Sequence, residues 1–178
     1  MAEEKLSGFF PHQGHSIEPG AFTLDLYRLV CMVLADRQVA NRTLTSDAIR
    51  SLQETHLRPE IGRILISCAA GLRILFDARP AIKGWIDRSD CGKLYPDWPS
   101  DESKVEKLTL REACNKIIHA QQIRFDEVVP NAAANPDNEG VFLRPYLYLY
   151  GSRNRHEWRA VLSIIDFAKW GAASFLGM

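Results

Sequence analysis

The sequence predicts a mainly helical single domain, in which four to five helices form a bundle and a β-hairpin precedes the last helix. Three observations lead to this prediction. Apolar residues recur with a helical period over most of the chain, and they alternate with a period of two at about residues 122–151. The 178 residues, 46% of them hydrophobic, also suffice for one sizeable core. We therefore expect an irregular arm at residues 1–20 and a single helical domain at residues 21–178.

Three helices are expected in the first half of the chain. Ala21–Ala40 is apolar on most sides, which is typical of a helix at the centre of a bundle. Ser46 can cap a second helix, and Arg58-Pro59 should end it and start a third, because proline suits the first helical position. Pro80 should end the third helix. That helix has the clearest apolar period, with Ile61, Ile64, Leu65, Cys68, Leu72, Leu75 and Phe76 on one face.

The second half is expected to contain loops, helices and the hairpin. The expected elements are a short helical turn at 82–86, a loop at 87–103, a helix at 104–121, strands at 123–129 and 141–150, and a closing helix at 158–175. The loop is rich in Ser, Asp, Gly and Pro, which are turn-forming residues. Pro145 places the second strand at an edge or at a bulge, because proline cannot donate a hydrogen bond to a neighbouring strand.

Charge and cysteine usage limit the classes of function. The 22 basic and 22 acidic residues give a net charge of zero, so the whole chain has no electrostatic attraction to nucleic acid or acidic membranes. It has neither an apolar run long enough to span a membrane nor the glycine-rich loops of nucleotide-binding enzymes. An acidic start and four widely separated cysteines indicate a cytoplasmic protein with reduced thiols. We expect no membrane association, metal or cofactor.

The most informative stretch is the predicted helix around residues 110–120. Arg111, Asn115 and His119 lie four residues apart and therefore form one polar stripe. A guanidinium can bind a phosphate, an amide can orient a ligand, and an imidazole can transfer protons near neutral pH. These groups match the needs of metal-free cleavage of an RNA phosphodiester. The alternative is an ordinary solvated helix face, on which the same residue types occur.

The segment Cys114–His119 resembles the signature of HEPN (higher eukaryotes and prokaryotes nucleotide-binding) domains. That signature has an arginine, a polar residue such as asparagine, three further residues and a histidine, on a late helix of a small bundle. Leu72–Asp77 also resembles the helix with an arginine and an acid that several members have. The resemblance covers about residues 21–120 and the closing helix. One position departs from the pattern, because Cys114 stands where the signature has its arginine.

The resemblance implies a bundle of four or five helices, a homodimer, and metal-independent RNA cleavage at a composite site across the dimer. Many HEPN proteins serve toxin–antitoxin or phage-defence systems. The departure at Cys114 leaves two alternatives open. Either Arg111 replaces the missing arginine, or the domain is degenerate and acts as a scaffold. In the second case, a partner protein or cognate antitoxin would dock on the hairpin or on the loop at 87–103.

Further cationic residues are candidates for nucleic-acid binding. Arg73 can lie beside His119 as a second phosphate ligand, or it can pair with Asp77 within its own helix. Arg153 and Arg155 belong to a basic turn after the hairpin, next to a strand face that carries Tyr146, Tyr148 and Tyr150. These tyrosines can stack with the bases of single-stranded RNA, or they can pack into the core while the arginines remain solvated.

Overall fold

The protein combines five helices with an antiparallel sheet of five strands in the part of the chain that the structure, a computed structural model, describes. This part covers residues 18–43, 46–79, 83–129, 140–154 and 156–176. The helices are α1 (Pro19–Thr43), α2 (Asp47–Ala78), α3 (Lys83–Ile86), α4 (Leu110–His119) and α5 (Ile164–Leu176). The strands are β1 (Gly92–Tyr95), β2 (Glu106–Lys107), β3 (Gln122–Val128), β4 (Phe142–Arg153) and β5 (His156–Ser163). The fold is therefore mixed α/β, and the prediction of a mainly helical domain missed most of the sheet.

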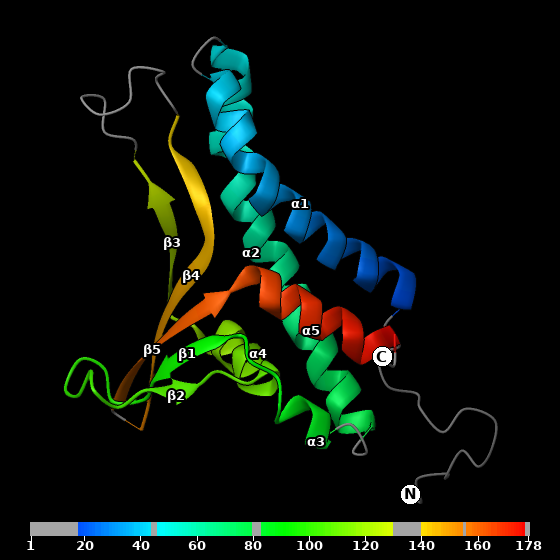
Figure 1. Ribbon diagram of the computed structural model, residues 1–178, viewed down its shortest axis with the longest axis vertical. Helices are drawn as coiled ribbons and strands as arrows, with labels where there is room; N and C mark the ends of the chain where they lie inside the picture. Colours follow the sequence, from blue (N-terminus) through cyan, green and yellow to red (C-terminus); the bar gives the residue numbers. More distant parts are fainter. Residues whose placement is uncertain (1–17, 44–45, 80–82, 130–139, 155, 177–178) are drawn as a thin grey trace, which may run out of the picture.

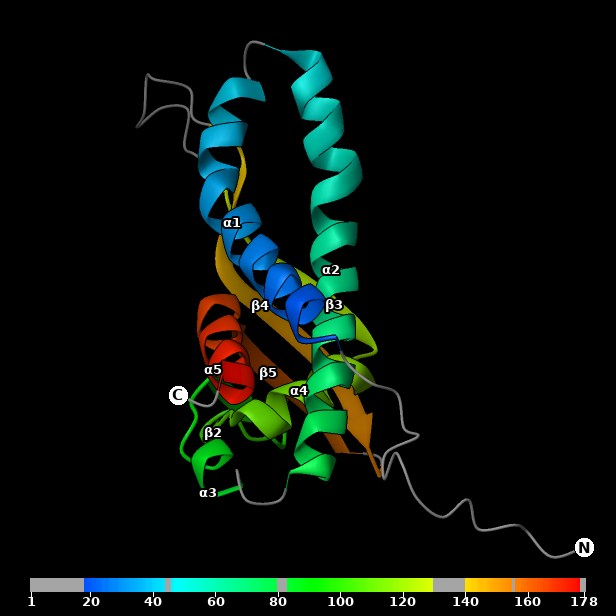
Figure 2. The same cartoon turned by 90° about the vertical axis from the view of Figure 1, so that its right-hand side faces the viewer.

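The sheet has the strand order β2-β1-β5-β4-β3, and all neighbours are antiparallel. Helices α1, α4 and α5 pack on one face of this sheet, and α2 packs on α1 and α4. Figure 1 shows the helices to one side of the sheet, and Figure 2 shows α1 and α2 crossing in front of it. We call the face toward the helices the covered face and the opposite one the open face.

Two helix boundaries differ from the prediction in the first and middle parts of the chain. Helix α2 runs through Pro59 without a break, although proline removes one helical hydrogen bond. The continuous burial of its apolar face from Ile61 to Phe76 outweighs this local preference. The helix expected at 104–121 begins only at Leu110, because Glu106–Lys107 pairs with β1 and Thr109 caps the helix.

Two further strands lie where a loop and a helix were expected. The loop at 87–103 contains β1, in which Gly92 has a positive φ of 136° and packs against the β5 backbone. Residues Trp158–Ser163 belong to β5, so the closing helix begins only at Ile164. The buried residues Trp158, Ala160 and Leu162 alternate with less buried ones, which is a strand pattern.

Several predictions are confirmed. The hairpin at about 122–151 is present as the pair β3–β4, with a bulge between Phe125 and Glu127. Ser46 caps α2 by accepting a hydrogen bond from Ile49 N at 3.4 Å. Most of the arm expected at residues 1–20 lies outside the described residues, and Pro19 and Gly20 belong to α1.

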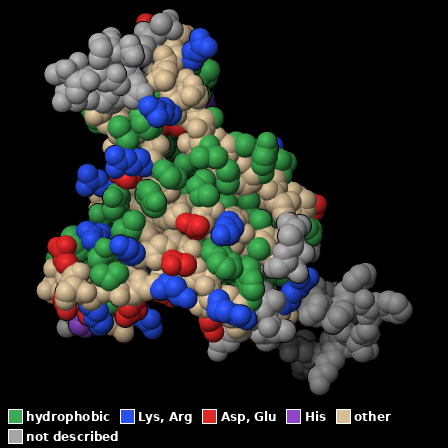
Figure 3. Space-filling view, in the orientation of Figure 1, with side chains coloured by type: hydrophobic (Ala, Val, Ile, Leu, Met, Phe, Trp, Pro, Cys, Tyr) green, Lys and Arg blue, Asp and Glu red, His purple; other side chains and the backbone are tan. Residues whose placement is uncertain are grey.

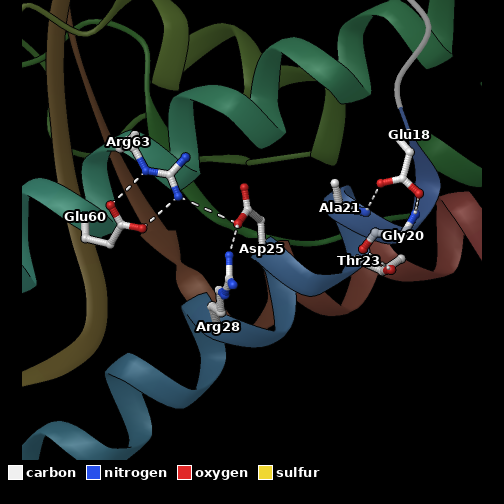
Figure 4. A network of polar contacts seen from close by, with 8 residues as sticks. All are labelled: Glu18, Gly20, Ala21, Thr23, Asp25, Arg28, Glu60 and Arg63. Carbon is white, nitrogen blue, oxygen red and sulfur yellow. Dashed lines mark hydrogen bonds and ion pairs between the residues drawn. The ribbon is translucent and has the colours of Figure 1, made fainter.

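Polar contacts tie α1 to its neighbours. Arg63 of α2 bonds to Glu60 at 2.7 Å and reaches Asp25 of α1 at 3.7 Å, and Arg28 lies 3.4 Å from the same Asp25 oxygen (Figure 4). The hydrogen bond from Arg63 holds the pKa of Glu60 below its usual value. Farther along α1, the buried carboxylate of Asp36 accepts hydrogen bonds of 2.7 Å from the Gln53 side chain and from the Leu143 backbone. Asp36 thus joins α1, α2 and the start of β4.

Candidate functional site

Helix α4 carries the motif, and its apolar face fixes its orientation. Thr109 Oγ1 accepts a hydrogen bond from Glu112 N at 3.4 Å, and the buried Ser89 Oγ accepts one from Leu110 N at 2.7 Å. Cys114 is completely buried on the core side of the helix, and this burial raises the pKa of its thiol. The position that holds arginine in the HEPN signature therefore lies in the core of this protein. It cannot contact a phosphate.

The polar face of α4 borders a cavity of about 510 Å³. The cavity is lined by Glu112, Asn115, Lys116, His119, Gln121, Ser152, Arg153 and Trp158. Three of the predicted site residues, Asn115, His119 and Arg153, thus meet at one place although Arg153 lies in β4. We call this cavity the α4 pocket.

Positive charge predominates in the α4 pocket. The Lys116 side chain is only 12% exposed, with Nζ 3.2 Å from Glu112 Oε1 and 4.2 Å from the centre of the Trp158 ring. The second carboxylate oxygen of Glu112 accepts a hydrogen bond from Asn115 Nδ2 at 3.0 Å. Both oxygens of this acid are thus engaged, whereas the exposed His119 and Arg153 face the cavity from its rim. The pocket has the chemistry of an anion site.

Of the two arrangements expected for Arg73, the structure has the one beside the polar stripe, and Asp77 pairs with Arg111 instead. Arg73 of α2 donates a hydrogen bond to Asn115 Oδ1, so it supports the motif through Asn115 rather than pairing with Asp77. The carboxylate of Asp77 instead bonds to Arg111 Nη2 at 3.0 Å. Arg111 is therefore directed toward α2 and does not line the α4 pocket, so two of the three residues of the predicted stripe, Asn115 and His119, reach the pocket. Arg155 lies outside the described residues.

Lys116 and Trp158 are among the pocket residues that sequence reasoning missed. Lys116 stands within the motif, directly after Asn115, and its place on the wheel beside Glu112 could have indicated it. Trp158 carried no comparable signal, because the sequence placed it in the closing helix rather than on the covered face of β5. Gly151 makes room for the Trp158 ring, since a side chain at this glycine would clash with the ring.

The tyrosine face of the hairpin does not pack into the core, which was one of the two alternatives for Tyr146, Tyr148 and Tyr150. Tyr148 and Tyr150 are half-buried and Tyr146 is 43% exposed, whereas Leu147 and Leu149 between them are fully buried. The leucines therefore form the core side of β4, and the tyrosines face outward from the open face. They are not part of the bundle core.

No protein-family model, curated protein sequence or solved structure matches this chain. Membership in the HEPN family therefore remains a prediction from the motif. No helix among the described residues is long and apolar enough to cross a membrane. The described residues likewise contain no group of three or more His, Cys, Asp or Glu side chains arranged to hold a metal ion.

Proposed function

We propose that this protein binds RNA in the α4 pocket and cleaves it without a metal ion. The observation that carries the proposal is the position of His119 at the rim of a cavity that also holds Lys116 and Arg153. Two cations can hold a phosphodiester there, and an imidazole beside them can transfer a proton to or from the reacting oxygen atoms. The resemblance of the motif to the HEPN signature supports the same chemistry.

The residue roles change from those that the sequence predicts. Lys116 and Arg153 take the phosphate-binding role, because both line the α4 pocket whereas Arg111 does not. Asn115 is held by Arg73 and Glu112, so it orients the substrate from a fixed position. Strand cleavage needs both an acid and a base. A homodimer, which the HEPN resemblance implies, can supply a second imidazole next to the first.

The proposed setting is cytoplasmic. All four cysteines are unpaired, and three of them are buried, which fits a reducing compartment. A ribonuclease that needs no cofactor suits a toxin–antitoxin or phage-defence system, because it can act as soon as it is released from its inhibitor.

The test is cleavage of mixed cellular RNA in the presence of EDTA. His119→Ala should lower the rate about 100-fold or more, which is the usual effect of losing a general acid or base. Lys116→Ala and Arg153→Ala should weaken RNA binding. His56→Ala, in α2, is the matched control and should cleave at the wild-type rate. Equal cleavage by the wild type and His119→Ala would exclude this role for His119.

A second candidate function is a degenerate module that binds a protein. Arg111 and Asn115 are both held by other residues, and an apolar groove of about 510 Å³ lies between α1 and α2. Met32, Val39, Leu52 and Leu57 are among the residues that line it. A groove between two helices suits an amphipathic helix, for example one from a cognate antitoxin. Absence of RNA cleavage, together with binding of a partner that is lost in Leu52→Glu but kept in His119→Ala, would favour this function.

A further inference from the structure

The open face of the sheet carries rows of aromatic and basic side chains. Cross-strand partners point to the same face, so the register defines each row. One row consists of Lys107, Lys93, Val161, Tyr148 and Arg124, and the next consists of Tyr95, Arg159, Tyr150 and Gln122. In Figure 3, the side of the molecule that the sheet occupies shows Lys and Arg side chains among hydrophobic ones, together with some Asp and Glu side chains. The two rows contain four cations, Lys107, Lys93, Arg124 and Arg159, and no acidic residue, so they form a local basic surface although the net charge is zero.

Arg159 is held rigidly within this surface. Its guanidinium carbon lies 4.2 Å from the centre of the Tyr95 ring and 3.7 Å from that of Trp98. Stacking between two rings fixes the plane of a guanidinium and leaves its edge available for hydrogen bonds. Among the described residues, neither Arg159 nor Arg124 has an acidic partner. Both cations are therefore available to a ligand.

Two cavities lie between the open face and the α4 pocket. The first, of about 570 Å³, follows β3 and includes Arg124, Tyr148, Tyr150 and Arg159 in its lining. A second cavity of about 230 Å³ shares Tyr150 with the first, and shares Gln121 and Trp158 with the α4 pocket. Gln121 N donates a 2.8 Å hydrogen bond to Tyr150 O, so the connection runs past the edge of the sheet where β3 begins. The cavities thus adjoin one another through shared lining residues, and we call this series of cavities the track.

We infer that the open face is a stacking surface for single-stranded RNA, which continues past Tyr150 and Gln121 to the α4 pocket. This inference rests on the proposed function and specifies its substrate as single-stranded. Bases stack on the rings of Tyr148 and Tyr150, while Arg124 and Arg159 bind the phosphates between them. A duplex cannot bind in this way, because its bases are already stacked on one another.

The acidic residues along the track do not prevent phosphates from binding there. Asp126 lies 3.9 Å from Arg144, and Glu127 bonds to Arg58, so both acids are neutralised by neighbours. Glu157 lines the second cavity, next to Tyr150. Because the carboxylate of Glu157 repels phosphates, we expect the phosphates to bind on the side of Arg159 and Arg124.

The test is binding of a fluorescent 12-nucleotide single strand, as RNA and as DNA of the same sequence, measured by anisotropy. The DNA strand cannot be cleaved through a 2′-hydroxyl, and stacking does not require that group, so the DNA strand reports on binding without cleavage. Tyr148→Ala and Tyr150→Ala should each weaken binding of both strands about 5- to 100-fold. Tyr148→Phe and Tyr150→Phe keep the ring and should bind nearly as the wild type does. Tyr27→Ala, at an exposed tyrosine of α1, is the matched control and should have no effect.

The outcomes separate this inference from the proposed function. Loss of binding in the alanine variants, with retention in the phenylalanine variants and in Tyr27→Ala, supports the stacking surface. Binding that depends on Lys116 and Arg153 but not on the two tyrosines overturns the surface and leaves the α4 pocket as the RNA site. Tyrosine-dependent binding without any cleavage of RNA overturns the proposed catalysis and supports the surface. If neither strand binds, or if a duplex of the same sequence, measured in the same way, binds as tightly as the single strands, the inference is wrong.

Discussion

The two faces of the sheet differ in composition although the same strands supply both. On the covered face Leu147, Leu149 and Leu162 are fully buried, whereas their neighbours Tyr148 and Val161 on the open face are half-buried. One set of alternating residues thus builds the core, and the other set is free to carry aromatic and basic groups. The contrast indicates that stability resides in the covered face and that ligand binding can reside in the open face. The two properties should therefore respond to different mutations.

The largest expected effect is the difference in reactivity at pH 8 between the buried thiols and the partly exposed one. Burial raises the pKa of Cys68 and of Cys91 to about 12, so their thiolate fraction is about a thousandfold smaller than that of an unfolded cysteine. Cys114 is buried as well, whereas Cys31 of α1 is partly exposed. In titration with a coloured disulfide reagent, we expect Cys31 to react first and the other three thiols to react only after denaturation. Rapid reaction of two or more thiols in the native protein would contradict the burial of the helical core.

The next largest effect is expected from truncation of the covered face. Leu149→Ala should lower the free energy of unfolding by about 2–5 kcal/mol, because it leaves a cavity in a fully buried position. Tyr148→Ala, on the neighbouring residue and the opposite face, should cost about 1 kcal/mol or less. Urea denaturation of both variants measures the difference. Equal losses would show that the two faces contribute equally to stability.

Gly151 tests the close packing of the covered face beside the α4 pocket. Gly151→Ala should destabilise the protein by about 1–3 kcal/mol, because the added methyl group would clash with the buried Trp158 ring. Gly62→Ala in α2 is the matched control, since a side chain there meets no atom within 4 Å. That control should stabilise the protein by about 0.5–1 kcal/mol through helix propensity. Thermal denaturation of both variants shows which one is destabilised and which one is stabilised.

Asp36 tests the polar link between α1 and the covered side of β4. Asp36→Ala should cost about 2–3 kcal/mol, because it leaves the backbone N–H of Leu143 without its buried acceptor. Asp87→Ala, at an exposed aspartate, should change the free energy of unfolding by no more than about 0.5 kcal/mol. Amide hydrogen exchange at Leu143 should also accelerate in the Asp36 variant. Unchanged exchange would mean that another group holds the start of β4.

The smallest expected effect concerns the exposed pair of Glu60 and Arg63. The hydrogen bond from Arg63 lowers the pKa of Glu60 in the folded state, so the pair stabilises the protein above the ordinary pKa of glutamate. This contribution is lost as the pH falls through the lowered pKa. Glu60→Gln should therefore reduce stability slightly at pH 7, by less than any variant above, and its effect should be smaller at pH 3 than at pH 7. A larger loss of stability at pH 3 than at pH 7 would contradict a lowered pKa of Glu60 in the folded protein.

The sequence located the helices and one hairpin better than it located the rest of the sheet. Periodicity identified α1, the pair β3–β4 and the residues of α2, although it divided α2 into two helices at Pro59, because each of these long segments repeats its apolar pattern several times. Short strands such as β1 and β2 repeat their pattern too few times to be recognised. The apolar residues of β5 and α5 follow one another without a break, so the strand was included in the helix. β1 was missed also because the many turn-forming residues at 87–103 predicted a loop.

The candidate site could be predicted in part. Asn115 and His119 follow from the spacing on one helix, and this is why the motif placed both at the α4 pocket. The partners of Arg73 and Arg111 could not be derived, since a helical wheel gives a residue's direction but not the neighbouring helix that it meets. Arg153 was identified as a basic turn residue, without any indication that the turn lies beside α4.

The sequence by itself determined the amphipathic pattern of each long segment and the polar stripe of the 110–120 helix, because both depend on spacing along the chain. The tertiary structure alone decided which face of each element is covered. It buried Cys114 in the core, joined Arg111 to Asp77, and brought Trp158 and Arg153 to His119. These outcomes depend on contacts between segments far apart in sequence. Local periodicity carries no information about such contacts, because they form only when strands pair and helices pack on the sheet.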